Sequence, residues 1–441
     1  MIDALLNPAF LGLAMVITFM TLIMTRRMSA IAALLAVPIT FGLIAGAGPG
    51  LGKMILEGVH QVAPTALLLA FAILYFAIMM DAGLFDPLVR RVLAAVGDDP
   101  VRIALGTALL TMTVSLDGDG TTTALIVITA FLPVYRRVGM NPLVLATLLG
   151  LGNALMNYIP WGGPTARAAS AVGAELGTVF NPLVPAMLVG LGVVFVLAWH
   201  FGRRERHRLA AQPRPDGRAA TAPPDVLAAD PSVRRPRLFW VNLALTAGLV
   251  VGMAVHLAPL PVMMMGAFAI AATVNYPRPR DQKARIAAHA DNVVNVVVLI
   301  FAAGAFTGIL NGTGMADAMA SAALAHLPRD LGPHLAPLTA LASLPLTFVM
   351  SNDAYYFGVV PVVARAAGEF GISADAIARA SLVGQPVHAL SPLLAPIYLA
   401  CGLLGVDVGD AQRFALKWAL LICGVVLATA LATGAIPLTA G

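Results

Sequence analysis

The stretch Ser115-Leu-Asp-Gly-Asp-Gly-Thr-Thr-Thr123 places two carboxylates and four hydroxyls between apolar segments with the character of membrane helices. An aspartate in the hydrocarbon core costs roughly 2.5–3.5 kcal/mol, so Asp117 and Asp119 need a partner or a water-filled cavity. A second polar island, Ser351-Asn352-Asp353, lies in the other half of the chain. Paired polar islands at corresponding positions of two halves are typical of the binding site of a secondary transporter.

The composition indicates a polytopic membrane protein. Of the 441 residues, 59% are hydrophobic and 11% are charged, whereas about 25% of residues are charged in soluble domains. The formal net charge of +5 comes from Lys and Arg in short loops, which is a topology signal and disfavours nucleic-acid binding. No basic region precedes the first apolar run, so we expect no cleaved signal peptide. Cys401 and Cys423 lie in apolar runs, as buried free thiols do.

Apolar runs long enough to cross a hydrocarbon core of about 30 Å recur along the chain. They are residues 9–24, 28–46, 62–82, 181–200, 238–256, 259–276, 291–311 and 413–434. Residues 102–136 and 333–365 each contain two shorter apolar arms around a polar tip, which predicts re-entrant hairpins. Residues 141–175 and 374–405 are interrupted near the middle by Pro and Gly, which predicts discontinuous helices.

The halves of the chain predict an inverted-topology repeat within an all-α fold. Residues 1–200 and 238–441 would each contain five crossings, and an odd number of crossings inverts the second repeat. A weak internal alignment supports this, because a Pro-x-x-x-Pro break at 160–164 matches one at 392–396. The Arg-rich and Pro-rich residues 201–237 are expected to form a disordered cytoplasmic linker.

The basic residues fix the expected orientation. If the loop at 25–28 is cytoplasmic, 22 of the 27 Lys and Arg residues fall on the inside. The positive-inside rule then places both termini outside. We therefore expect a multi-pass protein of the inner (cytoplasmic) membrane, in contact with lipid. Its first hairpin would enter from the cytoplasm and its second from the opposite face.

The hairpin tips carry groups that suit a charged ligand. Asp117 and Asp119 offer carboxylate oxygens to a hard cation or a proton, whereas Thr121 and Thr122 offer hydroxyls to an anion. The alternative is a polar turn in which Asp119 or Thr121 caps the following helix. The island Ser351-Asn352-Asp353 is the counterpart on the second hairpin, and a helix cap is again its alternative.

The first helix break adds a second set of groups. At Asn157-Tyr-Ile-Pro-Trp-Gly-Gly-Pro164, unwound carbonyls can hold cations while a new helix N-terminus presents amides to an anion. Arg167 lies about one turn into the second half-helix, where a carboxylate would bind it bidentately. The alternatives for Arg167 are an ion pair with Glu175 and a side chain that reaches the outer interface.

The break in the second half carries Gln385 and His388. Two roles fit His388, that of a proton relay, because an unperturbed histidine titrates near neutrality, and that of a packing residue. Asn153 and Gln385 occupy matching positions of the two halves, which suits either lining a site or hydrogen bonding between helices. Asp81 and Asp291 stand at the ends of predicted spans and are expected to be helix caps.

Together these motifs resemble the citrate–metal–proton symporter family, within the ion transporter superfamily that includes the sodium-dicarboxylate carriers. The resemblance rests on Asp117-Gly-Asp-Gly-Thr-Thr-Thr, Ile159-Pro-Trp-Gly-Gly, Ala166-Arg-Ala-Ala-Ser170, Ser351-Asn-Asp-Ala-Tyr-Tyr-Phe-Gly-Val and Gly384-Gln-Pro-Val-His. It implies uptake of citrate as a complex with a divalent cation, driven by protons and without a cofactor. The related dicarboxylate carriers hold substrate between two Ser-Asn-Thr hairpin tips, form homodimers and move a transport domain in an elevator fashion.

The resemblance also implies roles for the site residues. Asp117, Asp119 and Asp353 would face the metal of the substrate or take protons. Carboxylates would be held by Thr121, Thr122, Asn157, Arg167, Asn352 and the amides of Gly162 and Gly163, with Ser351, Gln385 and His388 beside them. Asp353 stands where the dicarboxylate carriers have Thr, which disfavours sodium coupling and favours metal-complex recognition or proton coupling.

Elementary electrostatics agrees with this substrate. Chelation by a divalent metal reduces the charge of citrate from about three to about one, which lowers the penalty of entering a low-dielectric site. A carrier for another di- or tricarboxylate, or for free citrate, is the alternative. An intramembrane enzyme that uses the aspartates as acid–base groups is disfavoured, because the sequence carries no metalloprotease or nucleophile motif. A passive channel is equally disfavoured.

Overall fold

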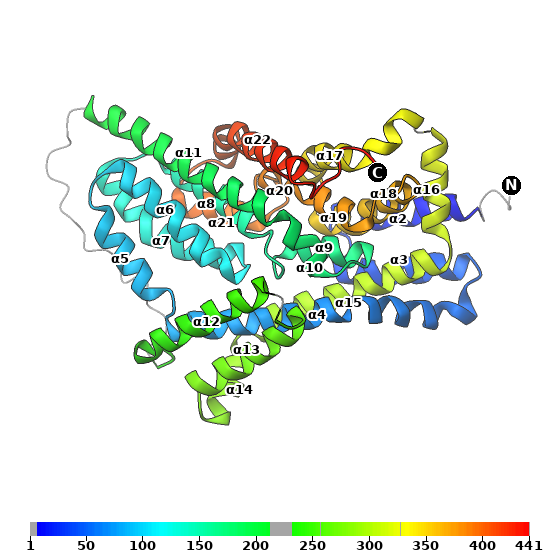
Figure 1. Ribbon diagram of the computed structural model, residues 1–441, viewed down its shortest axis with the longest axis horizontal. Coiled ribbons are helices and arrows are strands. Elements are labelled where there is room, and N and C mark those ends of the chain that lie inside the picture. Colours follow the sequence, from blue (N-terminus) through cyan, green and yellow to red (C-terminus); the bar gives the residue numbers. More distant parts are fainter. Residues whose placement is uncertain (1–6, 212–231, 256, 327, 441) are drawn as a thin grey trace.

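A computed structural model of the protein describes residues 7–211, 232–255, 257–326 and 328–440. Every regular element in these residues is a helix, which confirms the predicted all-α membrane fold. The helices form an elongated bundle (Figure 1). Five of the described helices are long and apolar enough to cross a membrane. With the short helical turns that adjoin them, these spans are Gly48–Ala82, Leu176–Ala210, Pro236–Met253, Ala290–Gly312 and Val408–Ala432. They contain α4 (Leu51–Ala82), α11 (Val184–Ala210), α12 (Phe239–Ala254), α15 (Ala290–Gly312) and α22 (Val408–Ala432).

Three of the predicted spans form shorter helices than expected. They are α2 (Pro8–Met24), α3 (Ala30–Ile44) and α13 (Leu260–Asn275), with 17, 15 and 16 residues. At a rise of about 1.5 Å per residue, even α2 is only about 25 Å long. The apolar run of α3 extends into a turn at Gly46, where φ is 79°. The apolar run is therefore longer than α3, because the helix ends at the turn that Gly46 forms.

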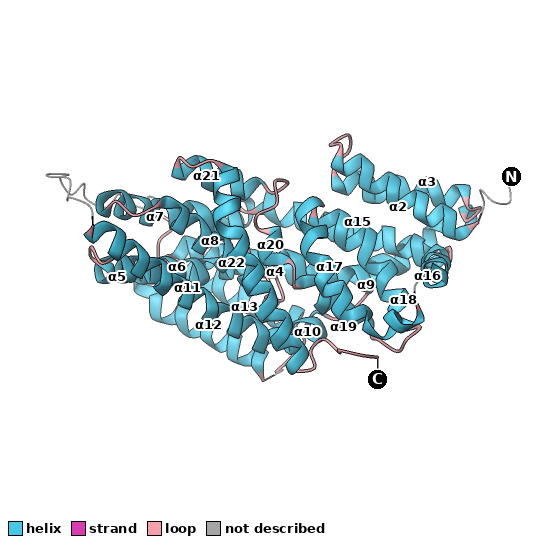
Figure 2. Ribbon diagram, turned by 90° about the horizontal axis from the view of Figure 1, so that it is seen from above, coloured by secondary structure: helices cyan, strands magenta, loops and turns pink. Residues whose placement is uncertain are grey.

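Each half of the chain contains two short helices joined at a polar tip. The first pair is α6 (Pro100–Val114) and α7 (Gly120–Val138), joined through residues 115–119. The second pair is α17 (Leu335–Val349) and α18 (Val360–Gly368), joined through residues 350–353 and a π-helical turn (Ala354–Val359). Helices α6 and α7 lie side by side in both views (Figures 1 and 2).

Each half also contains a helix interrupted by an irregular segment. In the first half α8 (Pro142–Met156) stops, and α9 (Gly163–Val172) begins after six intervening residues. In the second half α19 (Ala374–Leu382) and α20 (Gln385–His388) precede the break, and α21 (Ala395–Leu404) follows it. Asn141 and Ser373 cap the first helix of each set by accepting a backbone N–H.

Helices α4 and α15 cross at very short distance beside these segments. A Cβ atom added to Gly58 would lie 2.0 Å from the carbonyl oxygen of Gly304 and 2.8 Å from Cα of Gly308. Gly304, Gly308 and Gly312 recur every four residues, so they form one small-residue face on α15. Helices α4 and α15 are thus fixed to each other by backbone contact, and they form one wall of the site.

The predicted linker starts later than expected. Helix α11 continues to Ala210, so residues 201–210 are helical and the prediction of disorder was wrong for them. Arg206 explains part of this, because its guanidinium donates to both carboxylate oxygens of Asp99, at 2.6 and 2.8 Å. Burial alone would raise the pKa of Asp99, but the hydrogen bonds from Arg206 and from the amide of Val101 lower it. Residues 212–231 of the predicted linker lie outside the described residues.

Several short helices had no counterpart in the predictions. They are α5 (Asp86–Val96), α10 (Leu176–Phe180), α14 (Pro279–Ala288) and α16 (Met315–His326). The chain returns from the linker beside α4, where the amide of Arg235 donates to the carbonyl of Ala82 at 3.0 Å. The guanidinium of Arg235 also donates to the carbonyl of Asn275 at 2.9 Å. Arg235 therefore ties the start of the second half to the ends of α4 and α13.

Candidate functional site

Contacts between side chains bring the two tips and the two breaks together. The indole N–H of Trp161, in the first break, donates to the carbonyl of Leu116 in the first tip at 2.7 Å. Arg167 in α9 donates through Nε to Oδ1 of Asp353 in the second tip at 2.6 Å. Gln385, before the second break, donates to Oδ1 of Asn352 at 3.3 Å. Segments far apart in the sequence thus form one polar centre.

Asp119 caps the second arm of the first hairpin. Its Oδ1 accepts the amide of Thr121 at 3.0 Å, and its Oδ2 accepts the amide and the hydroxyl of Thr122 at 3.2 and 2.5 Å. Asp119 is therefore the N-cap of α7, as the alternative prediction for this residue stated. Asp117 Oδ1 accepts the amide of Asp119 at 2.9 Å. A carboxylate has about four lone-pair sites, so both groups keep acceptor capacity for a ligand.

The first break is held by a glycine and a threonine. A Cβ atom on Gly162 would lie 2.1 Å from the carbonyl oxygen of Asn157, so only glycine fits there. The hydroxyl of Thr165 contacts two unwound carbonyls, donating to those of Asn157 at 3.2 Å and Tyr158 at 3.0 Å. These carbonyls were expected to be open to a cation. The shared hydroxyl instead satisfies part of their capacity and holds the break in one conformation.

Substitution of Gly162 by alanine should therefore disrupt the break. The added Cβ must push the carbonyl of Asn157 away, and overpacking of this kind costs about 1–3 kcal/mol. We expect a lower melting temperature and a loss of transport, measured by thermal shift and vesicle uptake. Gly192→Ala is the matched control, because a Cβ at Gly192 meets nothing within 4 Å. Equal behaviour of the two variants would show that the close approach at Gly162 has no consequence.

The second tip is held by Ser351, Asn352 and Asp353 in three different ways. Ser351 Oγ accepts the amide of Ala354 at 3.2 Å, which is a cap of the following turn. Asn352 accepts from Gln385, whose Nε2 also donates to the hydroxyl of Tyr356 at 2.8 Å. Asp353 pairs with Arg167. Both expected alternatives for Arg167 were therefore wrong, since its partner is neither Glu175 nor the outer interface but the opposite hairpin tip.

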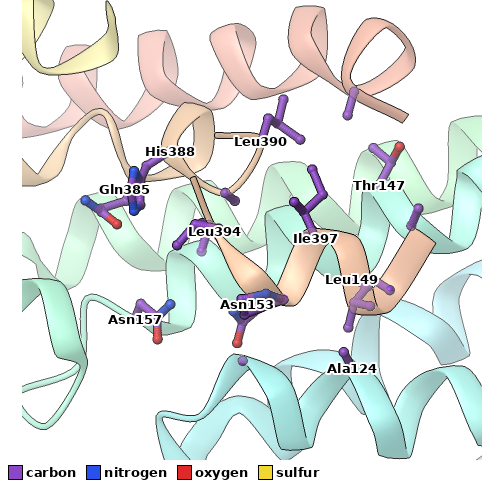
Figure 3. Close-up of a pocket in the computed structure, with 18 of the residues that line it drawn as sticks. Ala124, Thr147, Leu149, Asn153, Asn157, Gln385, His388, Leu390, Leu394 and Ile397 are labelled. Atoms are coloured by element: carbon purple, nitrogen blue, oxygen red, sulfur yellow. The ribbon is translucent and has the colours of Figure 1, made fainter. Parts of the chain in front are cut away.

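A cavity of about 190 Å³ lies between the breaks and the tips (Figure 3). We call it the amide cavity, because its polar lining is mostly carboxamide and carries no Asp, Glu, Lys or Arg among the described residues. Figure 3 shows Asn153 and Asn157 on the α8 side and Gln385 and His388 on the α20 side, with Leu149, Leu390, Leu394 and Ile397 beside them. Asn352 completes the polar lining.

His388 has one ring nitrogen engaged and one without a partner in the described residues. Nδ1 lies 2.5 Å from the carbonyl oxygen of Thr347, which can only accept, so Nδ1 carries a proton. In the neutral ring Nε2 is then a bare acceptor, and it is buried without a hydrogen bond. Oδ1 of Asn153 is in the same condition. Buried polar atoms without partners indicate that the amide cavity accommodates a ligand or water.

A second cavity, of about 270 Å³, lies on the α4 and α15 side of the first tip. We call it the aspartate cavity, because Asp117 and Asp119 line it together with Thr122 and Arg167. The wall opposite is formed by His289, Asn292 and Asn295 of the α15 segment, which sequence analysis missed. The signal was two asparagines three residues apart in an apolar run, a spacing that places both on one helix face.

Asp81 closes the end of this wall. Its Oδ2 lies 2.9 Å from Nε2 of His289 and 3.4 Å from Nη1 of Arg285. Asp81 is therefore a partner for basic side chains and not a helix cap, contrary to expectation. Asp291 lies in the first turn of α15, where a negative charge suits the helix dipole, and the described residues show no capping hydrogen bond from a side chain there.

The predicted site residues thus divide between two cavities. Gly118 and Gly163 line both of them. Thr121, Gly162, Ser351 and Asp353 line neither, and act through the hydrogen bonds, close contacts and ion pair given above or, for Thr121, through its amide. No group of three His, Cys, Asp or Glu side chains in the described chain could hold a metal ion. Asp353 faces Arg167 in this structure. The contact of Asp117, Asp119 and Asp353 with a metal or a proton therefore stays a prediction.

The overall fold is similar to that of two solved membrane proteins. It is similar to the crystal structure of the YdaH transporter of Alcanivorax borkumensis, with a TM-score of 0.63, 16% identity, and 98% of this chain and 100% of that chain covered. It is also similar to MtrF of Neisseria gonorrhoeae, described as representing a class of antimetabolite efflux pumps, with a TM-score of 0.61, 15% identity, and 89% and 87% covered. Fold and helix lengths together define a multi-pass, all-helical membrane protein.

Residues 16–384 match the citrate transporter family, and the chain belongs to that family. Similar relatives in Bacillus subtilis cover almost the whole chain. One, named citrate transporter, is 51% identical over 433 residues, which are 97% of this chain and 99% of the relative. Another, named Mg(2+)/citrate complex secondary transporter, is 45% identical over 432 residues, or 98% and 99%. The family consists of transporters and not of enzymes.

Proposed function

We propose that the protein is a secondary transporter that moves citrate, complexed with a divalent metal cation, in symport with protons. The observation that carries this proposal is the mixed charge of the aspartate cavity, where Asp117 and Asp119 share one lining with Arg167. The carboxylates would repel a bare anion, and a bare cation would offer no partner to the guanidinium. A metal–citrate complex offers both signs of charge. The relative named for the Mg(2+)/citrate complex supports the same substrate.

Within this proposal the two cavities have different tasks. In the aspartate cavity, Asp117 and Asp119 would face the metal, while Arg167, Thr122 and the asparagines of α15 would hold carboxylate and hydroxyl groups of citrate. In the amide cavity, Nε2 of His388 is the acceptor for a coupled proton, since a neutral imidazole gains a positive charge when it binds one. Gly118 and Gly163 line both cavities, so backbone without side chains lies between the proposed metal–citrate site and the proposed proton acceptor.

The proposed transport cycle uses alternating access. Two inverted repeats, 1–200 and 238–441, would move the tips and breaks as one transport domain against a scaffold that contains α4 and α15. An elevator motion of this kind requires a firm scaffold, and the glycine contacts between these helices favour it. We further propose a homodimer in the cytoplasmic membrane with both termini outside. Exposed apolar residues such as Trp240 of α12 and Val262 of α13 suit contact with lipid or with a second copy.

Counterflow uptake into proteoliposomes tests the proposal. Vesicles preloaded with unlabelled citrate and Mg²⁺ are diluted into labelled citrate with Mg²⁺, Ca²⁺ or other divalent metals, or with EDTA. We expect label to accumulate only with metal, and net uptake to require an inward proton gradient. Accumulation in EDTA would instead identify a carrier of free citrate. Uptake of another di- or tricarboxylate in place of citrate would change the substrate, and passive equilibration without counterflow would indicate a channel.

A further inference from the structure

An ion pair between the halves of the chain lies beside the aspartate cavity. Arg167 and Asp353 are 186 residues apart, yet Nε and Oδ1 lie 2.6 Å from each other. The side chains are 21% and 20% exposed, so both are partly buried and still reachable. Nη1 of Arg167 also donates to the carbonyl of Gly163 at 3.1 Å. This second bond keeps the guanidinium at the start of α9.

Asp353 already pairs with Arg167, which is the side chain that an anionic ligand of the aspartate cavity would need. Arg167 is the only Lys or Arg among the described residues that line the aspartate cavity. Asp117 and Asp119 line the same cavity, so citrate without a metal meets two carboxylates and a guanidinium that Asp353 neutralises. The carboxylates of Asp117 and Asp119 repel those of citrate, and this repulsion is stronger in a partly buried cavity than in bulk water. The cavity in this state is unfavourable for a bare anion.

We propose that the Arg167–Asp353 ion pair stands in for the substrate and makes citrate binding depend on metal; this inference rests on the proposed function. A carboxylate of citrate replaces Asp353 at Arg167, and the released carboxylate of Asp353 binds the metal of the same complex. Each charge exchanges one partner for another. Metal-free citrate supplies a partner for Arg167 only, and leaves Asp353 as an uncompensated, partly buried charge. That arrangement is strongly unfavourable, so free citrate is rejected.

The consequence is that neutralising Asp353 should relax the metal requirement. Asparagine keeps the shape of the aspartate side chain but leaves no charge to compensate when Arg167 turns to the substrate. We expect wild-type protein to bind labelled citrate with Mg²⁺ and to lose this binding in EDTA. Asp353→Asn should bind citrate in EDTA at least about tenfold more tightly than wild type does, equivalent to about 1.4 kcal/mol. The measurement is equilibrium binding to purified full-length protein.

Three further variants frame this result. Asp353→Glu keeps the charge and should keep the Mg²⁺ requirement. Asp353→Thr is a second neutral variant, and it tests the same metal requirement if Asp353→Asn does not fold. Asp317→Asn is the matched control, since it removes a carboxylate from another inter-helix ion pair, with Arg365 at 3.5 Å and exposures of 49% and 66%. We expect Asp317→Asn to behave as wild type in both buffers.

The outcomes separate the inference from the proposed function. A folded Asp353→Asn or Asp353→Thr protein that keeps the wild-type Mg²⁺ requirement, or that binds citrate in neither buffer, would overturn the inference. Wild-type transport of the Mg²⁺ complex would still stand in that case. Wild-type protein that binds citrate equally well in EDTA would overturn the metal-complex function itself. Folding is checked for every variant by size-exclusion chromatography and thermal shift.

Discussion

Replacement of Arg167 by glutamine should abolish citrate uptake in proteoliposomes. The variant loses the only Lys or Arg side chain among the described residues that line the aspartate cavity, and it leaves Asp353 without its partner. Removal of one member of a buried pair costs about 3–5 kcal/mol. If that cost falls on substrate binding, affinity drops by a factor between about 10² and about 4 × 10³. Initial rates of labelled citrate uptake with Mg²⁺, normalised to protein amount, measure the effect.

Two comparisons separate the chemical role of Arg167 from its structural one. Arg365→Gln removes another arginine that pairs with an acid on a different helix, but its pair is largely exposed, so the expected change is at most about 1 kcal/mol. The double variant Arg167→Gln with Asp353→Asn removes both charges. It should recover most of the thermal stability that Arg167→Gln loses, because no unpaired charge remains. Uptake by the double variant at the wild-type rate would contradict a role of Arg167 in substrate binding.

Substitution of Asp119 should distinguish a ligand from a helix cap. Asparagine caps a helix about as well as aspartate, so Asp119→Asn should fold and melt like wild type. It lacks the charge for a metal, and we expect at least about a tenfold loss of uptake, or about 1.4 kcal/mol. Asp119→Ala should lose uptake equally and also lose about 0.5–2 kcal/mol of stability with the cap. Thermal shift and uptake are measured on the same preparations.

The control for this series is a second aspartate cap. Asp407 accepts the amides of Gly409 and Asp410 at 2.7 and 3.2 Å at the start of α22, and it lines neither cavity. Asp407→Asn should therefore leave both stability and uptake unchanged. If Asp119→Asn also transports at the wild-type rate, Asp119 is only a cap, and the metal contact must fall to Asp117.

Local sequence was sufficient to predict most of the long helices, the polar tips and the segments around the breaks, but not the short helices α5, α10, α14 and α16. The residues responsible act over a few positions: Asp119 caps the next helix, and Gly162 admits a carbonyl that any side chain would exclude. The end of α11 was missed for a local reason too, because its many arginines suggested disorder. Neighbouring acids pair with them instead, as Glu205 does with Arg208 at 2.6 Å.

The arrangement within the site could not be predicted from local patterns. Asn292 and Asn295 face the first tip only because α15 crosses α4 through glycines, and that crossing joins segments from opposite halves of the chain. The pairing of Arg167 with Asp353 is also a property of the assembled fold. Glu175, eight residues from Arg167, was the nearer partner in sequence, but helix α9 presents Arg167 to the opposite tip. Inverted symmetry of the halves remains a proposal.

The ion pair between α9 and the second tip also has a consequence during synthesis. Arg167 enters the membrane with the first half of the chain, but its acidic partner is made 186 residues later. At about 5–20 residues per second, the ribosome needs roughly 10–40 s to reach Asp353. During this interval the unpaired guanidinium must stay in a polar environment, which water, lipid headgroups or the insertion machinery can provide. The nascent first half therefore carries an unpaired Arg167 until the second half is made.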